Sequence, residues 1–146
     1  MKNKPKVVVD TNIFIKGWFF DDISSTITIM DLIDKRKIQL LFSQETIGEL
    51  VYVMKNFVRH NIEDKNEQVE MLKDLMILFY YGTSVNTSEV NVVPLNDKYD
   101  EMFLKCAIKG CADYLVSNDF RSGLHQFEDI RVLSSDEFIK TYENVG

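Results

Sequence analysis

The segment KVVVDTNIF at residues 6–14 decides the fold class. Its run of three valines is typical of a short strand that is buried on both faces, as strands of a parallel sheet are. Asp10, Thr11 and Asn12 follow this strand at once, and each of them can cap a helix. We expect that helix to begin near Ile13. The segment therefore predicts a buried strand that passes directly into a helix.

The rest of the chain repeats this alternation of strands and helices. Strands are predicted at residues 38–42, 90–94, 114–117 and 130–133, and helices at residues 24–37, 63–81 and 97–110, after Ser43, and from Ser134 or Ser135. Gly110 is placed to end the helix at residues 97–110. The alternation favours an α/β domain with three layers, in which helices cover both faces of a central, mainly parallel sheet. The many helical residues in the middle of the chain predict a helical arm beside that sheet.

The length and charge of the chain narrow the class of protein. A chain of 146 residues has the length of one domain, and we expect residues 1–146 to form it. A formal net charge of −6 weighs against binding of nucleic acid through bulk positive charge. It does not exclude a nuclease, because bound metal ions supply positive charge locally. The sequence has neither an apolar run that could span a membrane nor a signal sequence, so we expect a cytoplasmic protein without membrane contacts.

The two cysteines, Cys106 and Cys111, lack the paired spacing of a zinc site. Two cysteines also make no disulfide framework. We expect both thiols to be reduced and to face the core.

Two acidic residues lie at the carboxyl ends of predicted strands. Asp10 follows the first strand, and Asp119 follows the strand at residues 114–117. In open parallel sheets functional groups gather at this edge. Each residue also has a structural explanation, because Asp10 can cap a helix and Asp119 can belong to a turn. The pattern by itself leaves both interpretations open.

Two further acids lie inside predicted helices. Asp100 shares a helical face with apolar residues such as Phe103 and Leu104, so its carboxylate points inward and needs a partner. The alternative is an acid in the first turn that the helix dipole stabilises. Glu49 lies roughly opposite the apolar stripe of its helix, and that face looks into either a cleft or the solvent.

Four segments, in order, resemble the motifs of PIN-domain ribonucleases. They are VVVDTNIF at residues 7–14, SQETIGEL at 43–50, DEMFLKCA at 100–107 and ADYLVSND at 112–119. The resemblance extends from about residue 6 to about residue 140. It implies that the chain is a single PIN-like nuclease domain with the three-layer α/β/α fold.

The resemblance also implies which residues form the site. The catalytic and metal-binding acids would be Asp10, Glu49, Asp100 and Asp119, with Asn12 orienting Asp10 and Ser117 close by. The segment after Asp119, FRSGL at residues 120–124, departs from the family's pattern. Asp113 therefore remains the alternative for the fourth acid.

Such a cluster would bind Mg²⁺ or Mn²⁺, since carboxylate oxygens suit hard cations. Close carboxylates repel one another, so they need bound cations or retained protons. We expect a metal-dependent endoribonuclease that hydrolyses RNA phosphodiesters. Lys16 and Arg121 follow two of the candidate acids closely, and we select them as phosphate-binding residues.

The family resemblance further implies partners. Small members of the family are often the toxin of a toxin–antitoxin pair and commonly form homodimers, so we expect RNA, a second copy of the chain and an antitoxin protein. The alternative is a catalytically silent PIN-like module that binds protein or RNA. The presence of all four acids argues against this alternative, because a binding scaffold does not need them.

Overall fold

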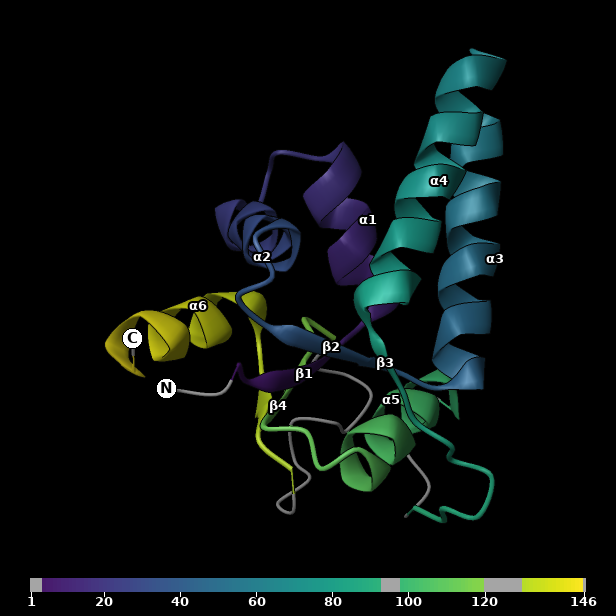
Figure 1. The fold of residues 1–146 in the computed structure, drawn as a ribbon. Helices are drawn as coiled ribbons and strands as arrows, with labels where there is room; N and C mark the ends of the chain where they lie inside the picture. Colours follow the sequence, from purple (N-terminus) through teal and green to yellow (C-terminus); the bar gives the residue numbers. More distant parts are fainter. Residues whose placement is uncertain (1–3, 93–97, 120–129, 146) are drawn as a thin grey trace.

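Five parallel strands form the central sheet in the described part of this computed structural model, which comprises residues 4–92, 98–119 and 130–145 (Figure 1). The strands are β1 (Lys6–Val9), β2 (Gln39–Phe42), β3 (Thr83–Ser84), β4 (Tyr114–Val116) and β5 (Val132–Leu133). Their order in the sheet is β3-β2-β1-β4-β5, and each neighbouring pair is parallel. β1 therefore lies at the centre, between β2 and β4. The predicted parallel sheet is confirmed.

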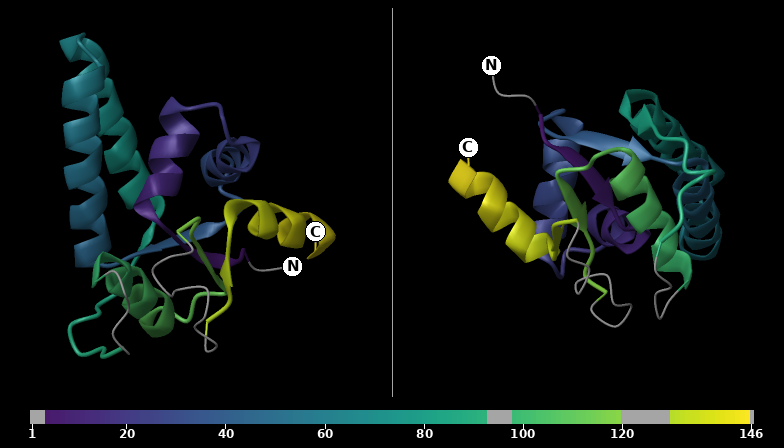
Figure 2. Two further views of the ribbon diagram at one scale, coloured as in Figure 1. Left: turned by 180° about the vertical axis from the view of Figure 1, so that it is seen from behind. Right: turned by 90° about the horizontal axis from the view of Figure 1, so that it is seen from below.

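Helices cover both faces of this sheet. They are α1 (Thr11–Phe19), α2 (Ser24–Asp34), α3 (Gln44–Asn61), α4 (Lys65–Tyr81), α5 (Lys98–Lys109) and α6 (Ser135–Val145). α5 packs on one face, and the other described helices gather on the opposite face (Figures 1 and 2). This arrangement confirms the three-layer α/β/α fold.

The alternation of side chains along each strand produces two separate cores. Val7 and Val9 of β1 pack in the core beneath α1, α2, α3, α4 and α6, whereas Val8 packs with Phe103 and Leu104 of α5. All three valines are buried, which explains why β1 is apolar without interruption. The prediction from the three valines, a strand that is buried on both faces, is therefore confirmed.

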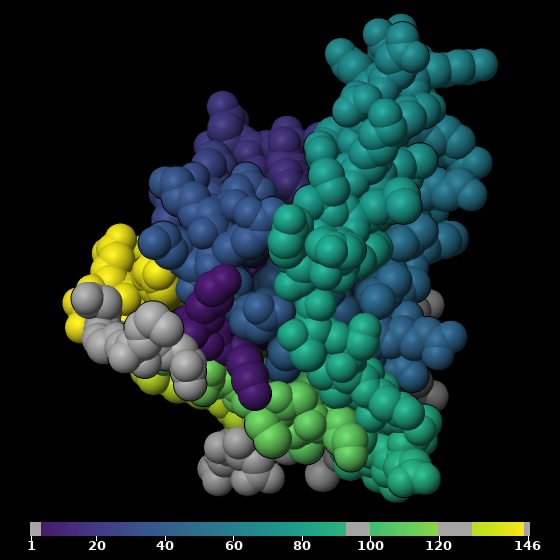
Figure 3. All heavy atoms as spheres, in the orientation of Figure 1, coloured from purple at the N-terminus to yellow at the C-terminus, as the bar shows by residue number. Residues whose placement is uncertain are grey.

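The helices α3 and α4 form the predicted arm. They lie side by side and extend beyond the edge of the sheet (Figures 1 and 3). α3 begins with a capping box, in which Ser43 Oγ accepts the N–H of Thr46 and Thr46 Oγ1 accepts the N–H of Ser43. Toward the outer end of α3, the ring centroids of Phe19 and Phe57 lie 4.5 Å apart, and this contact joins the end of α1 to the arm.

The prediction of a strand at residues 90–94 is wrong for its described part, residues 90–92, which have no strand geometry. The remaining strand of the sheet is instead β3, which directly follows α4 and for which the sequence analysis predicts no strand. Thr83 and Ser84 pair with Leu41 and Phe42, and the N–H of Val85 donates to Phe42 O. Since β3 is a two-residue edge strand with exposed side chains, it has no apolar alternation by which to recognise it.

The prediction that both cysteines face the core is right for Cys106 and wrong for Cys111, which is exposed. α5 ends in a Schellman motif, in which Ala112 N–H donates to Ala107 O and Cys111 N–H donates to Ile108 O. Cys111 holds the left-handed position with φ 53°, so its side chain leaves the helix face. Gly110 precedes this position and lies against Leu41 instead.

No helix in the described ranges is long and apolar enough to cross a membrane.

Two glycines in helices provide a matched test of the packing. At Gly17 an added Cβ would collide with the Met30 side chain and lie 2.8 Å from the backbone oxygen of Thr26, because α1 and α2 approach closely there. At Gly48 in α3 an added Cβ would meet nothing within 4 Å. We expect Gly17→Ala to lower the free energy of unfolding by about 1–3 kcal/mol. We expect Gly48→Ala to raise it by about 0.5–1 kcal/mol, since alanine favours helix. Urea unfolding of both variants checks this, and equal effects at the two positions would contradict the close approach of α1 and α2.

Candidate active site

The carboxyl edge of the sheet brings together several segments that are far apart in the sequence. β1 ends at Asp10, β2 ends at Ser43 and β4 ends at Ser117. α5 leads back into the amino end of β4, so its first turn, with Asp100, lies toward the carboxyl edge. Glu49 belongs to the second turn of α3, which starts at the same edge and packs against α5. The topology therefore places the four predicted acids toward the carboxyl edge of the sheet.

Asp10 is the residue at the centre of this edge. It occupies the N-cap position of α1, but its side chain makes no capping hydrogen bond. Asp10 is only 5% exposed, and its Oδ2 accepts a hydrogen bond from Ser117 Oγ at 2.9 Å. The N–H groups of Thr11 and Asn12 at the start of α1 still interact with this carboxylate, so capping does not exhaust its contacts but contributes to them. The side chain is held across the sheet, by the end of β4.

Ser117 links two of the candidate acids. Its hydroxyl donates to Asp10 and accepts the backbone N–H of Asp119 at 3.1 Å. Ser117 is fully buried, and its own N–H donates to Leu133 O of β5. A single serine side chain therefore ties the ends of β1 and β4 and sets the backbone position of Asp119. This placement agrees with the expected proximity of Ser117 to the site.

The surroundings of Asp10 raise the pKa of its carboxyl above the usual value. Burial is the largest cause, and the negative charge of Asp119 adds to it. The hydrogen bond from Ser117 and the N–H groups of Asn12 and Thr11 at the start of α1 lower the pKa, but by less. The ionised form of Asp10 is therefore destabilised, and a proton or a cation beside it would relieve this.

Asp100 and Glu49 differ in how far they are buried. Asp100 is 5% exposed, on the face of α5 that also carries the buried Phe103 and Leu104. A carboxylate in such a position has lost most of its hydration, and this loss costs free energy. The helix dipole at the first turn of α5 is therefore an insufficient explanation for an acid at this position. Glu49 is half-buried beside the fully buried Leu50. The face of α3 that carries Glu49 is thus neither part of the core nor fully exposed to solvent.

Asp113 lies at the opposite edge of the sheet. It immediately precedes β4, and its Oδ2 accepts the backbone N–H of Lys6 at 2.8 Å, while its own N–H donates to Lys6 O. These bonds join the amino ends of β1 and β4. Asp113 therefore has a structural role far from Asp10, and the geometry favours Asp119 as the fourth acid.

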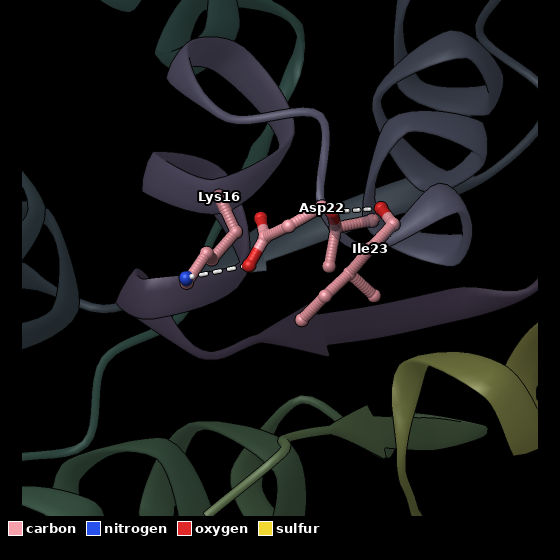
Figure 4. Close-up of polar contacts among 4 residues, drawn as sticks. Lys16, Asp22 and Ile23 are labelled. Carbon is pink, nitrogen blue, oxygen red and sulfur yellow. Dashed lines mark hydrogen bonds and ion pairs between the residues drawn. The ribbon is translucent and has the colours of Figure 1, made fainter.

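The predicted supporting groups are placed less favourably. Asn12 is exposed, and it acts on Asp10 through its backbone N–H. The Lys16 ammonium forms an ion pair with Asp22 Oδ2 at 3.2 Å (Figure 4). It also lies 4.7 Å from the ring centroid of Phe20. A phosphate would therefore compete with Asp22 for Lys16. Arg121 lies outside the described residues.

Three residues near the site were missed by the sequence reasoning. Asn118 bonds to Ser135 through both atoms of its amide, and Ser25 Oγ donates to Ser135 Oγ at 2.7 Å. Ser25 and Ser135 are buried. Ser25 is 110 residues from Ser135, so no local pattern could have revealed the contact.

The donor chemistry of the edge fits a hard divalent cation, because carboxylates and a hydroxyl supply only oxygen ligands. Asp10 and Asp119 are close enough for their charges to interact. No group of three or more histidine, cysteine, aspartate or glutamate side chains in the described ranges is arranged to hold an ion.

A cavity of about 390 Å³ lies elsewhere, between α1, α2, β2 and α4. Its lining includes Trp18, Asp34, Asp74 and Tyr81, and none of the four candidate acids. The candidate site therefore lies at the carboxyl edge of the sheet and not in this cavity.

Comparison with known proteins gives a family and a fold. The PIN domain family profile matches residues 6–121. No curated protein was found to be similar in sequence.

Solved structures with the same fold share little sequence with the chain. VapBC2 from Rickettsia felis, bound to a DNA fragment from its promoter, superposes with a TM-score of 0.57 at 14% identity, over 88% of this chain and 98% of that one. PAE2754 from Pyrobaculum aerophilum gives 0.59 at 12% identity, over 96% and 90%. The PIN domain of T. brucei RRP44 gives 0.51 at 12% identity, over 99% and 84%. At such identities the likeness concerns the fold alone.

The raised pKa of Asp10 predicts a pH-dependent stability of the metal-free protein. The folded state holds the Asp10 proton more tightly than the unfolded chain, whose pKa is near 3.8. The resulting stabilisation is complete below that value and is lost as the pH rises through the raised pKa. We therefore expect Asp10→Asn, which cannot ionise, to gain stability relative to the wild type as the pH increases from 4 to 7.

Chemical unfolding of both proteins in EDTA at several pH values measures this difference. As a second variant, Ser117→Ala should show a steeper loss of stability toward neutral pH than the wild type, since it removes the hydrogen bond that lowers the pKa of Asp10. A stability difference between Asp10→Asn and wild type that is independent of pH would contradict the raised pKa.

Proposed function

The chain belongs to the PIN domain family, and on this premise we propose that it is a metal-dependent endoribonuclease that hydrolyses RNA phosphodiesters. Family membership supports nuclease activity in general. The observation that carries the proposal is the buried carboxylate of Asp10, which Ser117 holds beside the negative charge of Asp119. Acids whose pKa is raised by burial and by a neighbouring like charge concentrate at functional sites.

The four acids would share the work of holding Mg²⁺ or Mn²⁺. Asp10 and Asp100, the two buried carboxylates, are the principal ligands in this proposal, and Glu49 and Asp119 complete the set directly or through water. A bound divalent cation supplies Lewis acidity for hydrolysis of the phosphodiester. Ser117 keeps Asp10 in place, because its hydrogen bond fixes the position of Oδ2.

The substrate would be bound by groups outside the acidic cluster. The chain carries 23 acidic and 17 basic residues, so RNA would approach a protein of net negative charge. Binding then depends on the cation and on a few basic groups near it. Arg121, two residues after Asp119, and Lys16 remain our candidates, although Lys16 would have to exchange Asp22 for a phosphate.

We also propose a biological role for the activity, as the toxin of a toxin–antitoxin pair in the cytoplasm. The support is the family resemblance together with the shared fold of VapBC2, a complex that is itself bound to promoter DNA. In this role the chain would form a homodimer and bind an antitoxin protein. The arm offers exposed apolar side chains for such contacts, among them Tyr52, Met76 and Tyr80.

Cleavage of RNA by the purified protein tests the proposed activity. We expect labelled RNA to be cut with Mg²⁺ or Mn²⁺ and to remain intact with EDTA. Asp10→Asn and Asp100→Asn should each lower the rate by about 100-fold or more, since each removes a carboxylate that would hold the cation. Gel analysis of single time courses is sufficient to measure these rates.

Asp113→Asn is the matched control for these variants. It changes the same functional group on the opposite edge of the sheet and keeps an oxygen that can accept the Lys6 N–H. Its rate should equal that of the wild type. Cleavage that persists in both Asp10→Asn and Asp100→Asn would refute the assignment of the site, and binding of RNA without any cleavage would favour the silent module.

The toxin role predicts an effect on living cells. We expect induced expression of the wild-type chain to slow the growth of a bacterial host, because RNA cleavage depletes the template or machinery of translation. Expression of Asp100→Asn at the same protein level should leave growth unchanged. Colony counts after induction measure both. Equal inhibition of growth by the wild type and by Asp100→Asn would show that the toxicity does not depend on the acidic site.

A further inference from the structure

The loop that carries Asp119 is anchored from behind by the side chain of Asn118. Asn118 Oδ1 accepts the backbone N–H of Ser135 at 2.9 Å, and Nδ2 donates to Ser135 Oγ at 3.0 Å. One amide thus makes two bonds to one residue, which fixes both its position and its orientation. Ser135 is the first residue of α6, so the anchor point is a helix N-terminus.

This anchor point is itself held firmly. Ser134 and Glu137 form a reciprocal capping box, in which Ser134 N–H donates to Glu137 Oε1 at 2.9 Å and Glu137 N–H donates to Ser134 Oγ at 3.2 Å. Ser135 is 2% exposed, and its hydroxyl also accepts a hydrogen bond from Ser25 of α2. The start of α6 is therefore held in place by several hydrogen bonds, and Asn118 binds to this fixed point.

Asn118 and the acidic site lie on opposite sides of the same short segment. Ser117 and Asp119, two residues apart, act on Asp10, whereas Asn118 between them bonds toward α6 and α2. The three consecutive side chains thus bond in two different directions. The two hydrogen bonds of Asn118 restrict rotation of the backbone at this residue. They therefore also restrict the directions in which the side chains of Ser117 and Asp119 point.

We propose that Asn118 is a positioning residue of the acidic site, which through its two bonds to Ser135 fixes Asp119 and Ser117 relative to Asp10. As a statement about catalysis, the proposal rests on the proposed nuclease function. As a statement about the loop, it rests on the hydrogen bonds alone. In this proposal Asn118 is neither a ligand nor a reacting group, since its Oδ1 and its Nδ2 both bond to Ser135.

The test compares Asn118→Ala with Ser25→Ala in the full chain. Asn118→Ala removes both bonds to Ser135 and frees the loop. We expect kcat for RNA cleavage to fall by about 10-fold, as for other groups that orient a ligand, with KM unchanged because RNA contacts remain. Backbone hydrogen exchange at Asp119, whose N–H donates to Ser117 Oγ, should become faster.

Ser25→Ala is the control for stability. It removes one buried hydrogen bond to the same Ser135 hydroxyl but leaves both bonds of Asn118 in place. We expect it to destabilise the protein while kcat and exchange at Asp119 stay at wild-type values. Asn118→Asp should restore slow exchange at Asp119, because a carboxylate oxygen can accept the Ser135 N–H at the helix N-terminus.

The outcomes separate this inference from the proposed function. Wild-type kcat and wild-type exchange at Asp119 in Asn118→Ala would overturn the positioning role, as would equal acceleration of that exchange in Ser25→Ala. A wild-type protein that cleaves no RNA with either metal would overturn the nuclease function. In that case exchange at Asp119 in the three variants by itself supports or overturns the role of Asn118 in holding the loop.

Discussion

The burial of the Asp10 carboxylate at the end of the central strand is the constraint on which the site depends. A charge with so little exposure is expensive unless other groups compensate for it. Ser117 supplies one hydrogen bond and the start of α1 supplies nearby N–H groups, yet the pKa of Asp10 remains raised. The fold thus keeps an acid where its ionised form is destabilised, and this is the environment in which a divalent cation binds with most benefit.

The sheet provides this environment through the order of its strands. β1 lies between β2 and β4, so the residue after β1 is enclosed by the residues after its two neighbours. The two cores, one with α5 and one with the remaining described helices, cover β1 on both faces and remove water from its end. The same burial that makes β1 a continuous apolar run therefore also isolates Asp10. Fold stability and site chemistry have one physical cause here.

The net negative charge of the chain is compatible with a polyanionic substrate if a bound cation supplies the attraction locally. A surface of net negative charge does not attract RNA over long distances. Attraction would instead be local, at a cation held by the edge of the sheet. Such a protein would depend strongly on the metal for binding as well as for catalysis, and partner proteins could use the exposed apolar side chains of the arm without competing for a basic surface.

The sequence by itself determined the layers of the fold, because hydrophobic periodicity is local: the valines of β1, the stripe of α3 and the capping residues Ser43 and Ser134 each act within a few positions. It also determined that Asp10 and Asp119 follow strands. Only the tertiary structure decided what depends on contacts between distant segments. It bonded the Asp10 side chain to Ser117 across the sheet, placed Asp113 at the far edge beside Lys6, put the fifth strand at the polar β3 and not at residues 90–92, and turned Cys111 outward. The bonds of Asn118 to Ser135 belong to the same class, since their partner lies 17 residues away on another element and leaves no trace in the local pattern.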